Sequence, residues 1–142
     1  MWNEYHRQSD LSLDIELTTY CNARCPQCSR TDQNDVNKRK HWLPLKQVTY
    51  NQFKKWFPKV SGIRNFHFSG KFGDPGMCKD LYEIVKYILD SDETTTVSVN
   101  TNGSMRDEDF WFDFASLGKY KPACEYNKGD KERLHIIFDV DG

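Results

Sequence analysis

The sequence predicts an α/β fold in which about four parallel strands alternate with helices. The first observation behind this prediction is that the spacing of apolar residues switches several times between a period of two and a helical period. The second is that a short polar or glycine-containing motif follows each predicted strand. Strict alternation of strands and helices implies a parallel sheet with right-handed crossovers, as in a (β/α) barrel or an open α/β sheet.

Four segments have the composition of strands. Residues 11–18 alternate apolar and polar side chains, and residues 63–69 place both of their phenylalanines on one face. Residues 94–101 are rich in β-branched side chains, and residues 134–140 are strongly apolar. Because four strands are too few to close a barrel in the usual way, the expected architecture is a partial, TIM-like (β/α) barrel.

Three segments between the strands have helical spacing. Thr49 is predicted to cap a first helix, whose apolar face consists of Phe53, Trp56, Phe57 and Val60. A second helix is expected over residues 81–89 and a third over residues 110–117, with Gly118 as its stop. The long polar stretch 31–46 is expected to be a loop.

Length and composition limit the function classes. With 142 residues, of which 37% are hydrophobic, the chain suits one globular domain spanning 1–142. Its 20 basic and 21 acidic residues leave no basic excess of the kind that binds nucleic acid. We find no apolar stretch of membrane-spanning length and no signal-peptide pattern, so we expect a cytoplasmic protein. Since the chain stops at Gly142, where the fourth predicted strand ends, we expect a domain truncated at that point.

The cysteines are clustered rather than spread. Three of the five lie within eight residues, as Cys21, Cys25 and Cys28, in the spacing Cys-x3-Cys-x2-Cys. A secreted disulfide framework is typically even in number and more widely spaced, so this pattern indicates metal or redox chemistry. Pro26 disfavours a helix here and favours a loop that could wrap an iron–sulfur cluster. Three thiolates would leave one iron open to another ligand, by the logic of catalytic metal sites.

This spacing, directly after a first strand, resembles the signature of the radical S-adenosylmethionine (radical SAM) superfamily. The resemblance implies a [4Fe–4S] cluster on the three cysteines, with S-adenosylmethionine bound to the open iron and cleaved to methionine and a 5′-deoxyadenosyl radical. That radical takes a hydrogen atom from a substrate. Family members usually carry an aromatic residue just before the third cysteine, near the adenine. Gln27 occupies this position here, so only its backbone is expected to meet the adenine.

Motifs after the other three strands extend the resemblance. The segment containing Ser69, Gly70 and Gly73-Asp74-Pro75 resembles the family's Gly-Gly-Glu-Pro motif, which binds the amino group of the methionine part. The pair Thr101-Asn102 corresponds to a Thr-Asn-Gly found close to the bound cofactor, although an ordinary turn with Ser104 as a helix cap would also explain it. After the fourth strand, Asp139 and Asp141 are the candidates for a ribose contact.

The resemblance also implies partners and a division of labour. The cofactor carries the chemistry, so no side chain is expected to act as a catalytic acid, base or nucleophile. A reductant such as flavodoxin or ferredoxin is expected, together with an unidentified substrate, which could be a peptide, a protein or a small molecule. The core domain is expected to be of radical SAM type from about Leu13 to Gly142.

Four alternatives remain open from the residues themselves. The three cysteines could share one buried helix face, or they could bind zinc with a fourth ligand, for which the candidates are His6, His41, Cys78 and Cys124. The module could also hold a cluster without catalysing a reaction. The run ending in Asp139 and Asp141 also resembles the first motif of haloacid dehalogenase-type phosphatases, with Asp139 as nucleophile and Mg²⁺ between the carboxylates.

Overall fold

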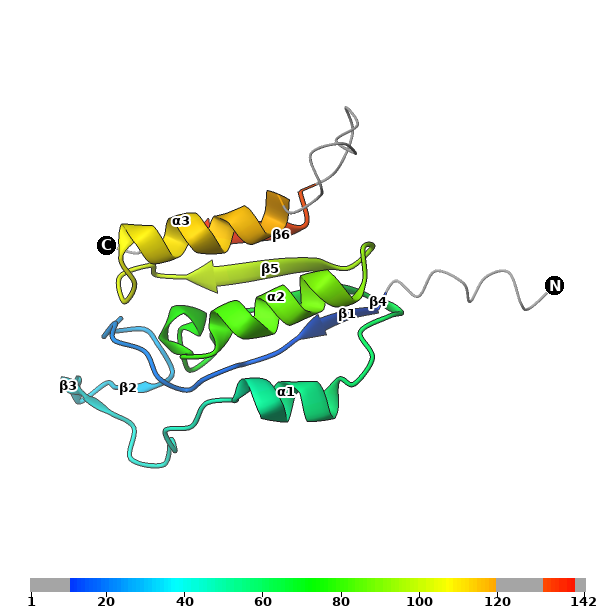
Figure 1. The fold of residues 1–142 in the computed structure, drawn as a ribbon. Coiled ribbons are helices and arrows are strands. Elements are labelled where there is room, and N and C mark those ends of the chain that lie inside the picture. The colour runs from blue at the N-terminus through cyan, green and yellow to red at the C-terminus, as the bar shows by residue number, and fades with distance from the viewer. Residues whose placement is uncertain (1–10, 120–131, 140–142) are drawn as a thin grey trace.

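The computed structural model describes residues 11–119 and 132–139 (Figure 1). Its main sheet consists of four parallel strands, in the order β1-β4-β5-β6. Their bounds are β1 Leu11–Asp14, β4 Ile63–Phe68, β5 Thr96–Thr101 and β6 Leu134–Phe138. The predicted α/β class and the four-stranded parallel sheet are therefore confirmed.

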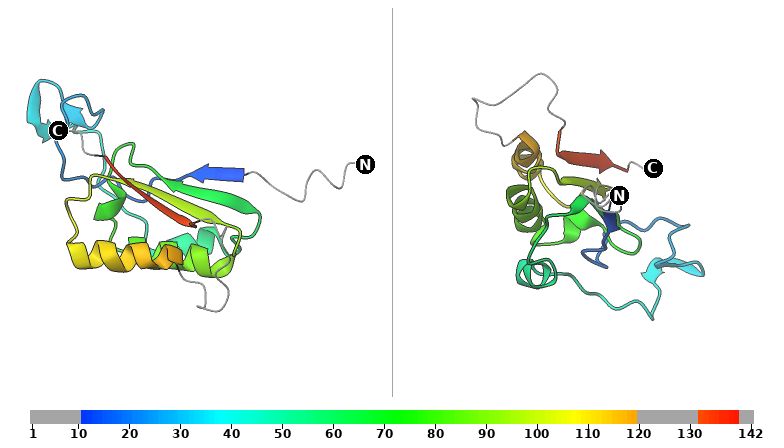
Figure 2. Two further views of the ribbon diagram at one scale, coloured as in Figure 1. Left: turned by 90° about the horizontal axis from the view of Figure 1, so that it is seen from above. Right: turned by 90° about the vertical axis from the view of Figure 1, so that its right-hand side faces the viewer.

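The helices are α1 Tyr50–Trp56, α2 Leu81–Ser91 and α3 Glu108–Ser116. All three cover the same face of the sheet (Figure 2). Two short 3₁₀ turns, η1 Pro75–Met77 and η2 Leu117–Lys119, complete the helical elements of the described residues. This arrangement follows from the apolar stripe of α2, which buries its five leucine, isoleucine and valine side chains against the strands.

Caps fix where the helices begin. Thr49 caps α1 as predicted, since its Oγ1 accepts from Gln52 N and its own N–H donates to Gln52 Oε1 at 2.9 Å. Helix α3 begins at Glu108, two residues before the expected start at residue 110. Its N-cap is Asp107, which accepts from Phe110 N at 2.9 Å, so the alternative in which Ser104 caps this helix is wrong.

The core lies between the sheet and the helices. Phe66 of β4, Val97 of β5 and Leu134 of β6 are neighbours across the sheet and are buried. The prediction for the first helix is partly wrong. Helix α1 ends at Trp56 and has fewer than two full turns. Phe53 is its buried residue, whereas Trp56, at the last position of the helix, is 55% exposed.

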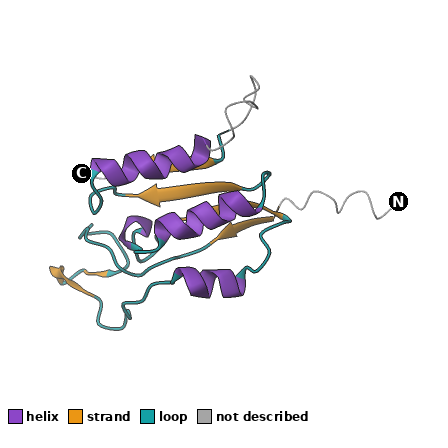
Figure 3. Cartoon of the chain, in the orientation of Figure 1, coloured by secondary structure: helices purple, strands orange, loops and turns teal. Residues whose placement is uncertain are grey.

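A short hairpin replaces part of the expected loop over residues 31–46. Strands β2 Thr31–Asp32 and β3 Asp35–Arg39 pair antiparallel, and Lys40 N donates to Arg30 O at 2.8 Å beside them (Figure 3). The prediction missed this hairpin because its strands are polar and lack an apolar period. In the described part of the chain, no helix is long and apolar enough to cross a membrane.

Candidate functional site

The three clustered cysteines lie on a loop that leaves the sheet after β1. Cys28 N donates to Cys25 O at 3.0 Å, which closes a turn with Pro26 in the second position that proline favours. Thr31 N donates to Cys28 O at 2.9 Å and closes the next turn. Cys25 is exposed, Cys21 and Cys28 are half-buried, and all three thiols are free. The expected loop is confirmed, and the alternative of a helix carrying three buried cysteines is wrong.

The donor set of this loop fits an iron–sulfur cluster. Cysteine thiolates are the ligands of such clusters, and each binds a different iron, so the sulfurs need not meet at one point. Within residues 11–119 and 132–139, no group of three or more His, Cys, Asp or Glu side chains is placed to hold a metal ion. Of the proposed fourth zinc ligands, Cys78 is buried in the core and His41 is exposed, whereas His6 and Cys124 lie outside the described residues.

Cys78 is buried, whereas Cys25 in the cysteine loop is exposed, and this difference can be tested by chemical modification. Cys78 Sγ lies 3.5 Å from Val48 O, and burial raises the pKa of the thiol to about 11, so the unreactive thiol form persists below that pH. We expect iodoacetamide at pH 8 to modify the exposed Cys25 of the cluster-free protein, but to modify Cys78 only after unfolding. Peptide mapping by mass spectrometry would check this, and equal labelling of Cys25 and Cys78 in the folded protein would contradict it.

Asp74 joins the segment after β4 to the end of β5. Its Oδ1 accepts hydrogen bonds from Gly76 N at 2.7 Å and Thr101 Oγ1 at 2.6 Å, and its Oδ2 accepts from Asn102 N at 2.7 Å. Its backbone N–H donates to Tyr20 O in the cysteine loop at 2.7 Å. A carboxylate offers about four acceptor positions. The buried Asp74 side chain therefore keeps one acceptor position on Oδ2. Its side chain joins the segment after β4 to the end of β5, and its backbone N–H joins both to the cysteine loop.

Close backbone packing explains two of the glycines in this segment. A Cβ at Gly73 would lie 1.8 Å from Thr18 O, and one at Gly70 would lie 1.6 Å from Gly73 O. Glu16 holds the same backbone from the other side, because its Oε1 accepts from Phe72 N at 2.5 Å and Gly73 N at 2.9 Å. Glu16 was not among the predicted site residues, because a lone acidic residue two positions after the end of β1 carries no local signal for such a contact.

Asn102 connects the end of β5 to the cysteine loop. Its Nδ2 donates to Asn22 Oδ1 at 3.0 Å and lies 3.8 Å from Cys21 Sγ, as a donor to sulfur. Its Oδ1 accepts from Ser104 N at 3.0 Å and from Ser104 Oγ at 2.6 Å. These bonds fix the orientation of the amide, because a flipped amide would place donor against donor at Ser104. Asn102 therefore presents N–H groups to the loop that carries the cysteines.

The other predicted site residues lie along the same edge. Gln27 is exposed in the third position of the Cys25–Cys28 turn, and Pro75 begins η1. Asp139 directly follows β6, where its N–H donates to Thr101 O at 2.9 Å and its side chain is exposed. Asp141 lies outside the described residues. The structure thus gathers the cysteine loop, the Gly73–Pro75 segment and Thr101-Asn102, with Asp139 following the neighbouring strand.

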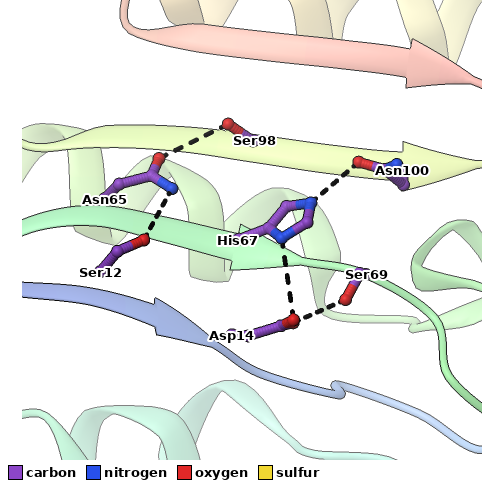
Figure 4. Close-up of polar contacts among 7 residues, drawn as sticks. All are labelled: Ser12, Asp14, Asn65, His67, Ser69, Ser98 and Asn100. Carbon is purple, nitrogen blue, oxygen red and sulfur yellow. Dashed lines mark hydrogen bonds and ion pairs between the residues drawn. The ribbon is translucent and has the colours of Figure 1, made fainter.

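A row of polar side chains crosses the sheet face opposite the helices. His67 of β4 lies between Asp14 of β1 and Asn100 of β5, with its Nε2 3.0 Å from Asn100 Oδ1 and its Nδ1 3.8 Å from Asp14 Oδ2 (Figure 4). Ser69 Oγ donates to Asp14 Oδ1 at 2.6 Å, so this predicted residue faces the polar row. Asn65 continues the row toward the start of the strands. We call these residues, with Ser12 and Ser98, the inner polar row.

The inner polar row is unusual for a parallel sheet. Strands of such sheets are normally buried on both faces and are nearly continuous in apolar residues. Here β4 and β5 alternate, with apolar side chains toward the helices and polar ones on the other face. A polar face suits an interior that holds water or a ligand rather than a second helix layer. The alternation is visible in the sequence, and it could have identified His67 and Asn100 had both faces been considered.

Comparison with known proteins gives a family match. The model of the Radical SAM superfamily matches residues 15–123, which include the three cysteines, Asp74 and Asn102. The matched family is not that of the haloacid dehalogenase-type phosphatases.

The chain is similar to part of a named protein and to part of a protein of known structure. The PqqA peptide cyclase of Bradyrhizobium diazoefficiens is 33% identical over 82 residues, which are 56% of this chain and 19% of the cyclase. Two structures of BtrN, one in an open conformation and one in complex with AdoMet and 2-DOIA, superpose with TM-scores of 0.57 and 0.58. Each is 20% identical and matches 89% of this chain and 55% of the BtrN chain. The likeness to BtrN supports the fold, and the chain spans only part of each relative.

Proposed function

Since the chain belongs to the radical SAM superfamily, a family of enzymes, we propose that Cys21, Cys25 and Cys28 bind a [4Fe–4S] cluster beside a bound S-adenosylmethionine. When bound, the reduced cluster supplies the electron that cleaves S-adenosylmethionine to methionine and a 5′-deoxyadenosyl radical, which takes a hydrogen atom from the substrate. The observation that carries the proposal is the hydrogen-bonded contact between three segments at the carboxyl edge of the sheet. Asp74 N–H to Tyr20 O and the Asn102 amide to Asn22 join the cysteine loop to the other two motifs.

Each side chain in this site has a role that its contacts support. The remaining acceptor position of Asp74 Oδ2 suits the amino group of S-adenosylmethionine, since a carboxylate and an ammonium form a charge-assisted hydrogen bond. Asn102 holds the cysteine loop in place, and its N–H near Cys21 Sγ contributes to the reduction potential, because hydrogen bonds to cluster sulfurs are one determinant of it. Asp139 is the candidate for a ribose contact, as the carboxyl edge of parallel strands is where ligands bind.

The substrate is proposed to approach the inner polar row. The side chain of Asp14 is 66% exposed and that of His67 is 34% exposed. Both residues lie near the carboxyl edge of the sheet, where the cofactor motifs are. They offer a carboxylate and an imidazole to a polar substrate, which we propose to be a peptide, a protein or a small molecule. A flavodoxin or ferredoxin is the proposed source of electrons. The free thiols of the cysteine loop suit a reducing compartment, for which we propose the cytoplasm.

Reductive cleavage of S-adenosylmethionine tests the proposal directly. The full protein is purified anaerobically, reconstituted with iron and sulfide, and mixed with S-adenosylmethionine and dithionite. We expect about four irons and four sulfides per chain, together with equal amounts of methionine and 5′-deoxyadenosine by mass spectrometry. A protein that holds the cluster but forms neither product would be a non-catalytic cluster module, and one that binds about one zinc and no sulfide would be a structural metal module.

A further inference from the structure

Basic residues are concentrated around the cysteine loop. Residues 21–46 contain six of the 20 basic residues and two of the 21 acidic ones, which leaves 14 basic and 19 acidic residues in the rest of the chain. The six are Arg24, Arg30, Lys38, Arg39, Lys40 and Lys46. A positive segment of this kind within an otherwise acidic chain creates a local field that attracts negatively charged partners.

The contacts of these side chains leave much of their charge uncompensated. Arg30 Nη1 donates to Cys21 O at 2.7 Å, Arg24 Nη1 donates to Asn37 Oδ1 at 3.1 Å, and Arg39 Nη1 donates to Leu43 O. All three acceptors are uncharged. Lys38 does pair with Asp35 at 3.1 Å, although the lysine side chain is 72% exposed. Solvent-exposed pairs of this type are weak and leave both groups open to other partners.

These cations surround an opening beside the proposed cluster site. An open cavity of about 400 Å³ is lined by Cys21, Arg24, Arg30, Lys38 and Arg39, and also by the 45% exposed Val36. The β2–β3 hairpin that carries half of these residues projects from the carboxyl edge of the sheet, away from the helices (Figure 2). An apolar side chain within a ring of charges is the usual composition of a protein-binding patch. We call this surface the basic hairpin and define it by the exposed residues Arg24, Val36, Lys38 and Arg39, whereas Arg30 is buried behind them at 8% exposure.

We propose that the basic hairpin is the docking surface for an acidic electron-carrier protein of the flavodoxin type. This inference rests on the proposed function, which requires an electron from outside the chain. In the docked pair, one electron leaves the reduced flavin, which is oxidised, and enters the cluster, which is reduced, and no bond is made or broken. Contact at this surface places the carrier next to a cavity wall that includes Cys21. Redox encounters of this class are small, transient and steered by charge.

Reversing the hairpin charge separates docking from chemistry. In the double variant Lys38→Glu, Arg39→Glu, we expect the rate of cluster reduction by reduced flavodoxin at low salt to fall by about tenfold or more. Reduction by dithionite should be unchanged, because this small reductant needs no protein docking surface. The matched control is Lys55→Glu, Lys59→Glu, which makes the same charge change on exposed residues near the end of α1, and it should keep the wild-type rate with both reductants.

Each outcome decides between the hypotheses. Equal flavodoxin rates in the hairpin variant and the wild type, with full iron and sulfide content, would overturn the docking surface. Slower turnover of the hairpin variant with dithionite would also overturn it and would assign the cavity to an anionic substrate or cofactor. If the hairpin variant loses its cluster, the salt dependence of the wild-type flavodoxin rate decides, since a rate independent of salt contradicts charge-steered docking. Failure of the wild type to cleave S-adenosylmethionine with either reductant would instead contradict the proposed function.

Discussion

Cys25→Ala is expected to remove the cluster and abolish S-adenosylmethionine cleavage while leaving the fold intact. Loss of even an outer-shell partner of a metal site costs about 10–100-fold in affinity or activity, so loss of a direct ligand should exceed roughly a hundredfold. The fold should survive because Cys25 is exposed, and its contact in the loop, the carbonyl that accepts from Cys28 N, belongs to the backbone. Alanine keeps that carbonyl and creates no cavity in the core.

Cys78→Ala is the matched control for this substitution. Cys78 is fully buried in the core cluster, so its removal should lower the free energy of unfolding by about 0.5–3 kcal/mol, as is typical of core truncations. It should not change iron or sulfide content. Metal analysis and thermal unfolding should therefore give opposite results for the two variants. Cys25→Ala should lose iron and keep its stability, whereas Cys78→Ala should keep its iron and lose stability. Cleavage of S-adenosylmethionine by Cys25→Ala at the wild-type rate, with full iron content, would show that this cysteine is not a cluster ligand.

The sheet and the cysteine loop were predictable because their signals are local. The apolar period of α2 and the β-branched run of β5 each lie within about ten residues, and Pro26 alone disfavours a helix through the cysteines. The β2–β3 hairpin was missed since its two polar strands bury little apolar surface and carry no period. Trp56 was misplaced because helical spacing does not reveal where a helix ends.

The connections within the site were less predictable, since they join residues that are distant in sequence. The motif at Asp74 was recognised, yet its hydrogen bonds from Thr101 and Asn102 depend on how β4 and β5 pair. Glu16 is a similar case, because its contact with Phe72 N and Gly73 N forms only when β1 lies beside β4. Sequence motifs therefore identified which segments meet, and the register of the sheet determines which atoms do.

Substitution of Asp74 is expected to have the second largest effect, because this residue contributes both to stability and to the proposed binding of the cofactor. In Asp74→Ala, the N–H groups of Gly76 and Asn102 and the hydroxyl of Thr101 lose their acceptor in a site where the Asp74 side chain is 7% exposed. Each buried donor left without a partner costs about 1–3 kcal/mol, so the loss of the acceptor for three donors is expected to lower the free energy of unfolding by at least about 3 kcal/mol. Urea or thermal unfolding measures this loss.

Asp74→Asn and Thr101→Val separate the two roles. Asparagine keeps the shape and one oxygen of Asp74. Its Nδ2 would face either the N–H of Asn102 or the donors at Gly76 and Thr101. Because donor would then face donor, about 1–3 kcal/mol of stability should be lost. Asparagine also removes the negative charge proposed to bind the amino group of S-adenosylmethionine, which should weaken binding to the cluster-loaded protein by about tenfold or more. Thr101→Val removes the hydroxyl that donates to Asp74 Oδ1 and accepts from Gly103 N, but it keeps the Asp74 carboxylate, so it should cost about 1–3 kcal/mol and leave that affinity near wild type. Calorimetric titration with S-adenosylmethionine distinguishes the variants: equal affinities for Asp74→Asn and Thr101→Val would mean that Asp74 acts only as the link between β4 and β5, with the cofactor amino group bound by other groups.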